Sequence, residues 1–136
     1  MTGLLDRILD YIADNIKPKV VTKTASSKAV NNNTRTELTN VALGPGVWAV
    51  TCHASYPANA TGRRWIGCIL GAIANISEFA AQAPPASGGV TRMEITSVVT
   101  NAGNTDQTFR LAGYQTSGSS LTVTDINIRA VRIGPA

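Results

Sequence analysis

Charge, aromatic side chains and cysteine are all scarce in this chain of 136 residues. Only 15% of the residues are charged and 5% are aromatic, and there are two cysteines and one histidine. Two cysteines are too few for a disulfide framework. The formal net charge of +4 is scattered along the chain. A nucleic-acid footprint would be a concentrated basic patch, so we expect no nucleic-acid partner.

Long hydrophobic runs are also missing. No apolar stretch is long enough to cross a bilayer, so we expect no membrane insertion. The first apolar stretch is interrupted by Asp6, Arg7, Asp10 and Asp14, and we therefore expect no secretory signal.

The residue inventory gives little support to an enzyme. The single histidine, His53, follows Cys52, but adjacent strand residues point to opposite faces and form no dyad. The carboxylates are spread over separate elements, and no nucleophile elbow, phosphate loop or zinc-ligand spacing occurs. We expect no catalytic activity, no cofactor and no metal.

What the sequence does contain begins with a helical pattern. Leu5, Leu9, Ile12 and Ile16 recur at spacings of four, three and four, which makes one apolar stripe, and Pro18 ends the helix. We assign residues 1–19 to an amphipathic helix. A helix this short is marginal in water unless its stripe is buried. The stripe is expected to bind other copies of the chain or a larger assembly, and packing on its own domain is the alternative.

The pattern then changes to strands. Residues 20–35 are interpreted as a linker and an edge strand near 26–30, and residues 36–136 as a head domain. Between 47 and 56 the alternation puts five side chains on one face, which we expect in the core: Trp48, Val50, Cys52, Ala54 and Tyr56. Further strands are expected near 36–42, 65–73, 90–101, 107–115 and 119–133. The total of about eight strands predicts a mainly β protein, a jelly-roll β-sandwich preceded by one short α-helix.

Two features of these strands leave alternatives open. The strand at 65–73 is apolar on both faces, which implies that a loop or another subunit covers its outer face. Residues 75–89 are expected to form a long irregular connection around a turn near 77–81. Cys52 and Cys68 lie on different strands, either as free buried thiols or as a single bridge.

Two segments carry a family resemblance. Residues 43–50, Leu-Gly-Pro-Gly-Val-Trp-Ala-Val, form a tight turn into a strand that resembles an element of the C1q/TNF-like jelly-roll heads. Residues 113–123 followed by 128–133 are similar to the C-terminal strand pair of bacteriophage fibre and spike head domains. The resemblance spans residues 36–134 and implies a homotrimer with the helix entering at one end.

This resemblance implies a structural virion protein, a fibre, spike or capsid-decoration head that its N-terminal helix anchors to capsid, portal or tail. The protein would be assembled in the bacterial host cytoplasm and exposed on the particle. The alternative is a head that binds a host receptor or a carbohydrate.

Under that alternative, ligand contact is expected at loops 57–64, 75–89 and 101–107. The candidate contact residues are one basic–aromatic group and two further aromatic side chains: Arg63, Arg64, Trp65, Phe79 and Tyr114. The opposing interpretation places the three aromatic side chains in the core or in a trimer interface.

Overall fold

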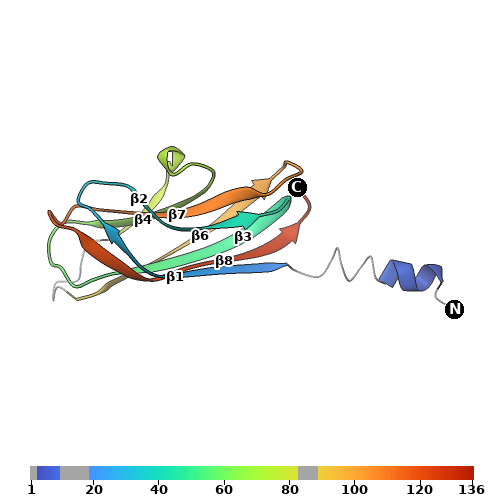
Figure 1. Cartoon of the computed structure of the whole chain (residues 1–136), viewed down its shortest axis with the longest axis horizontal. Helices are drawn as coiled ribbons and strands as arrows, with labels where there is room; N and C mark the ends of the chain where they lie inside the picture. The colour runs from blue at the N-terminus through green and yellow to red at the C-terminus, as the bar shows by residue number, and fades with distance from the viewer. Residues whose placement is uncertain (1–2, 10–18, 83–88) are drawn as a thin grey trace.

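The chain folds into a β-sandwich of two four-stranded sheets (Figure 1). The computed structural model describes residues 3–9, 19–82 and 89–136. The elements are β1 (Val20–Val30), β2 (Thr36–Leu43), β3 (Gly46–Tyr56), β4 (Arg64–Leu70), the 3₁₀-helix η1 (Ile73–Asn75), β5 (Phe79–Gln82), β6 (Thr91–Asn101), β7 (Gln107–Gln115) and β8 (Leu121–Gly134).

The strand pairing is that of a jelly-roll. β1 pairs with β8, β2 with β7, β3 with β6 and β4 with β5, all antiparallel, as in a long hairpin wrapped into two layers. The sheet orders are β1-β8-β3-β6 and β2-β7-β4-β5. This arrangement confirms the predicted fold class.

The core follows from the alternation in β3. Trp48, Val50, Cys52, Ala54 and Tyr56 are all buried, as predicted, and they pack against the inner side chains of the opposite sheet. The Trp48 indole N–H donates a 3.0 Å hydrogen bond to the carbonyl of Gly44, which fixes the turn that precedes the strand.

Three strands differ from the prediction. β4 ends at Leu70 and not at residue 73, because the chain turns at Gly71, whose φ is 136°, and the 3₁₀-helix η1 follows. β1 begins at Val20 and is paired with β8 from Val20–Val131 to Val30–Leu121, so residues 20–25 belong to the sheet and are not a linker. As the edge strand, β1 is held by backbone pairing and keeps mostly polar, exposed side chains, which hide the strand pattern. The expected irregular connection also contains the strand β5, which pairs with β4.

At Gly67 the outer face of β4 is covered by the chain itself. The connection between β4 and β5 places Ile76 over Gly67, where a side-chain Cβ would come within 2.8 Å of Ile76 and 2.7 Å of Phe79. Ile76 is buried in this position. At Gly67 the outer face of β4 is therefore covered by the loop that follows the strand, and no second subunit is needed there.

The helical residues 4–9, in contrast to Gly67, are left uncovered by the rest of the described chain. Their large apolar side chains are exposed, by 72% for Leu4, 68% for Leu5, 45% for Ile8 and 54% for Leu9. This part of the stripe does not pack on the sandwich. Ile12 and Ile16, the other two predicted stripe residues, lie outside the described residues.

Candidate functional site: an aromatic and arginine hollow

One hollow on the outer face of the β2-β7-β4-β5 sheet gathers most of the predicted contact residues. It has a volume of about 300 Å³ and is lined by Arg35, Trp65, Phe79 and Tyr114. Trp65 comes from β4, Phe79 from β5 and Tyr114 from β7, while Arg35 precedes β2. The structure thus brings the three predicted aromatic side chains together and adds an arginine that the sequence analysis missed.

Trp65 and Tyr114 form the floor of the hollow. They are directly opposite each other in the β4–β7 register. Their ring centroids are 5.2 Å apart with the planes at 65°, which is the edge-to-face arrangement that aromatic quadrupoles favour. The Tyr114 hydroxyl donates a 3.2 Å hydrogen bond to Asn33 Oδ1. Both rings are only partly buried, so their remaining surface is available to a ligand.

Phe79 and Arg35 form one wall. Phe79 is paired with Gly67, whose missing side chain leaves the space that the ring occupies. The Arg35 guanidinium carbon lies 4.8 Å from the centroid of the Phe79 ring, within cation–π range. Arg35 Nη1 also donates to the carbonyls of Ile73 and Ala74, at 3.1 and 3.2 Å. These contacts hold an exposed arginine in a defined orientation.

The loop that carries Arg35 is fixed to the sandwich. The Asn33 N–H donates to the Gln115 carbonyl at 2.9 Å, and Asn33 has a φ of 56°, in the left-handed region that Asn tolerates better than most residues. Asn32 Oδ1 accepts a 2.9 Å hydrogen bond from the Gly118 N–H. The wall of the hollow is therefore preformed.

The two predicted arginines next to Trp65 have different positions. Arg63 is exposed, and its guanidinium carbon lies 6.0 Å from the centroid of the Trp65 ring, at the limit of cation–π contact. Arg64 is fully buried, and its guanidinium donates 2.8 Å hydrogen bonds to the carbonyls of Asn59 and Thr61. Direct ligand contact by Arg64 was therefore a wrong expectation, because its side chain points into the sandwich and braces the β3–β4 loop.

The predicted contact loops do not share one end of the sandwich. Arg64 pairs with Gln115, and Leu70 pairs with Phe109, so β7 starts at the Leu70 end of β4 and finishes at the Arg64 end. The loop 57–63 lies at the Arg64 end, whereas the connection 102–106 lies at the opposite end. Only the first of these adjoins the hollow.

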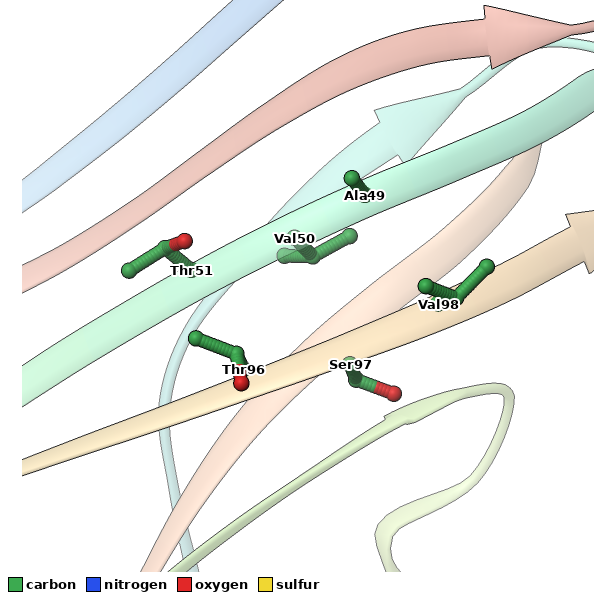
Figure 2. Close-up of a pocket in the computed structure, with 6 residues that line it drawn as sticks. All are labelled: Ala49, Val50, Thr51, Thr96, Ser97 and Val98. Atoms are coloured by element: carbon green, nitrogen blue, oxygen red, sulfur yellow. The ribbon is translucent and has the colours of Figure 1, made fainter.

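A second hollow, of about 410 Å³, lies over β3 and β6 in the other sheet. Figure 2 shows the side chains at this site, which are short and carry no ionisable group: Ala49, Val50, Thr51, Thr96, Ser97 and Val98. Without a charged or aromatic group, this surface offers a ligand little to recognise.

Other chemistry in the described residues is limited. Cys52 and Cys68 are free thiols, and His53 points to the opposite face of β3 from Cys52. His53 Nδ1 lies 2.8 Å from the backbone carbonyl oxygen of Asp125. Residues 3–9, 19–82 and 89–136 contain no cluster of three metal-binding side chains. Within the same ranges no helix has the length and apolarity needed to cross a membrane.

Comparisons with known proteins place the fold among viral and TNF-like jelly-rolls. No family model and no curated protein matches the sequence. Among solved structures, a chain of infectious bursal disease virus strain Gt gives a TM-score of 0.60 at 13% identity, over 88% of this chain and 33% of that one. A chain of the VP2 subviral particle of the same virus gives 0.56 at 14% identity, over 88% and 33%.

The Eiger TNF of S. frugiperda gives a TM-score of 0.53 at 12% identity, over 88% of this chain and 94% of that one. This chain spans about a third of the length of the viral chains. At these identities the likeness establishes the jelly-roll fold. The more specific resemblance to bacteriophage fibre heads stays a prediction.

Proposed function

We propose that this chain is a structural virion protein, a homotrimeric jelly-roll head of the fibre, spike or capsid-decoration kind, anchored to the particle by its N-terminal helix. The observation that carries the proposal is a contrast in burial. The sandwich buries its own core, whereas the apolar side chains of residues 4–9 are mostly exposed. Burying such a side chain stabilises an assembly by about 1.5–3 kcal/mol, so the helix has a strong tendency to bind a partner.

The fold likeness to chains of a virus particle and to a TNF supports this proposal at the level of architecture. The partners we assign are two further copies of the chain and a capsid, portal or tail protein. The head would be assembled in the cytoplasm of a bacterial host and displayed on the particle surface. The proposal assigns no catalytic activity.

The test compares the wild-type chain with a Leu5→Asp, Leu9→Asp double variant. Arg7→Asp is the control, because it introduces a carboxylate on the same helical turn away from the stripe. Native mass spectrometry gives the oligomeric state, and sedimentation of assembled particles gives incorporation. We expect a wild-type trimer that enters particles, and a double variant that stays folded but is not incorporated.

Each outcome is informative. A double variant that remains trimeric but is excluded from particles supports anchoring by the helix with trimer contacts in the sandwich. A double variant that becomes monomeric supports trimerisation through the helix. A monomeric wild-type chain over a wide concentration range overturns the trimer, and unchanged incorporation of the double variant overturns the anchor.

A second candidate function has its own observation. The aromatic and arginine hollow is a preformed site on the head, as the receptor- or carbohydrate-binding alternative requires. Adsorption of the isolated protein to host cells, and its binding to a glycan array, test this candidate independently of particle incorporation.

A further inference from the structure

We propose that the hollow lined by Arg35, Trp65, Phe79 and Tyr114 binds a carboxylate-bearing sugar unit, with the guanidinium of Arg35 as the partner of the carboxylate. This inference rests on the second candidate function, a ligand-binding head. It names the ligand class of that site.

The charge around the hollow favours an anion. Arg35 lines it directly, Arg63 lies beside Trp65, and the lining residues include no carboxylate. The nearby Glu37 is neutralised by Arg110, whose Nε lies 2.7 Å from its carboxylate. Arg35 uses Nη1 for the carbonyls of Ile73 and Ala74, which leaves Nε and Nη2 along one edge of the guanidinium fork. That edge has the geometry that binds a carboxylate with two parallel hydrogen bonds.

The arrangement of the three aromatic rings favours a sugar over a stacked nucleic-acid base as the ligand. Arg35 already covers one face of Phe79, and Trp65 and Tyr114 meet edge-to-face, so the three rings do not form an open platform for successive bases. Their partly exposed surfaces suit the C–H groups of a pyranose ring. A volume of about 300 Å³ is at the small end of ligand sites, the size of one or two sugar rings.

Preorganisation strengthens the assignment. The wall is held by the hydrogen bonds of Asn32 and Asn33. The floor is held from below by Tyr56, whose hydroxyl bonds to the backbone of both Trp65 and Tyr114. A ligand therefore does not have to order these groups when it binds, which lowers the entropic cost of association.

The experiment uses the two tryptophans of the full chain as reporters. Trp65 lines the hollow, while Trp48 is buried in the core and serves as an internal control. The indole N–H signals are followed by NMR during titration with sialyllactose, with a glucuronic acid disaccharide, with neutral lactose and with a short oligo-dT. Sialyllactose and the glucuronic acid disaccharide distinguish a sialic acid from a uronic acid as the source of the carboxylate.

We expect at least one acidic sugar to shift Trp65 and not Trp48, with millimolar or tighter affinity, and lactose to bind about tenfold more weakly. Arg35→Gln should remove the preference for the acidic sugar. Trp65→Ala, measured by isothermal titration calorimetry because it lacks the reporter indole, should remove binding of either sugar. Arg129→Gln, the same charge change at an exposed site on the other sheet, should leave the affinity within about twofold.

Three results overturn the proposal: equal affinity for acidic and neutral sugars, tighter binding of oligo-dT, or no Trp65 shift with any probe. Arg35 also braces the β4–β5 loop, so a lysine variant is measured in parallel. A preference kept by Arg35→Lys and lost by Arg35→Gln assigns the effect to charge. The absence of all sugar binding, together with an intact trimer and normal particle incorporation, removes this site and leaves the structural proposal standing.

Discussion

The hydroxyl of Tyr56 donates a 2.7 Å hydrogen bond to the backbone carbonyl of Trp65. Tyr56 ends β3 in one sheet and Trp65 lies in β4 of the other, so this bond joins the two layers. The same hydroxyl accepts a 3.0 Å hydrogen bond from the N–H of Tyr114. A buried core residue thus holds both strands that carry the floor of the hollow, and the shape of the surface site depends on the core.

Replacement of Tyr56 by phenylalanine should therefore destabilise the sandwich. The ring keeps its packing, but the backbone groups of Trp65 and Tyr114 lose a buried partner, which costs about 1–3 kcal/mol. Urea unfolding measures the change in free energy. Tyr114→Phe is the matched control, because it removes a hydroxyl whose one hydrogen bond within the described ranges is to the exposed Asn33, and it should cost less than about 1 kcal/mol. Equal losses in the two variants would contradict the bridging role of Tyr56.

Stability at alkaline pH should report on the same hydroxyl. Burial raises the pKa of Tyr56 above its usual value of 10.0, more than the hydrogen bond from the Tyr114 backbone lowers it. Above that usual value the unfolded chain releases the phenolic proton and the folded chain retains it, so the free energy of unfolding falls as pH rises. We expect a decline between about pH 9.5 and 11.5 that is weaker in Tyr56→Phe. Identical slopes in the two proteins would exclude this contribution.

The alternation in β3 was enough to predict its five core residues, because each inward residue is apolar. The fold class was predicted from the number of strand-like segments, most of which are separated by turns that contain glycine or proline. The strands β1 and β5 were harder to predict from the sequence. The exposed edge strand β1 keeps polar side chains on most positions, and β5 has only four residues, so neither gives a clear period. Their place in the sheets is set by backbone pairing with β8 and β4.

The candidate site was also predicted in part. The chain has few aromatic residues, so these were candidates for ligand contact, and three of them line the hollow. The sequence did not indicate Arg35 as a site residue, because the carbonyls that hold its side chain, those of Ile73 and Ala74, are 38 and 39 residues away in the chain. Arg64 was expected to contact a ligand because it belongs to the basic–aromatic group Arg63-Arg64-Trp65, but its side chain is buried. Three loop carbonyls, including those of Asn59 and Thr61, accept hydrogen bonds from the two Nη atoms of its buried guanidinium, while its Nε has no partner among the described residues.

Gly113 should be intolerant of substitution for a steric reason. A Cβ at this position would lie 2.6 Å from the Tyr56 hydroxyl oxygen and 3.4 Å from Leu38. Gly113→Ala should therefore displace Tyr56 and cost about 1–3 kcal/mol. Gly134→Ala is the control, because no atom lies within 4 Å of its Cβ position, and it should change stability by less than about 0.5 kcal/mol. Thermal unfolding of both variants measures the change in stability. A Gly113→Ala variant as stable as the wild-type chain would mean that the two sheets separate easily at this position.

Cys52 and Cys68 should resist alkylation to different degrees. Both are free thiols, Cys52 buried and Cys68 partly buried. Interaction with the neighbouring Cys68 and burial raise the pKa of Cys52, whereas interaction with Cys52 lowers the pKa of Cys68. Since the thiolate is the reactive form, iodoacetamide at pH 8 should modify Cys68 first, and Cys52 about a hundredfold more slowly than in urea.

Peptide mapping by mass spectrometry after timed labelling separates the two sites. The control is the labelling of the chain in urea without reductant, where both thiols should react fully. A mass lower by two hydrogens, with neither thiol reactive in urea, would mean that the chain had oxidised to a Cys52–Cys68 disulfide. Faster labelling of Cys52 than of Cys68 in the folded protein would show that burial and the neighbouring thiol do not control reactivity in this core.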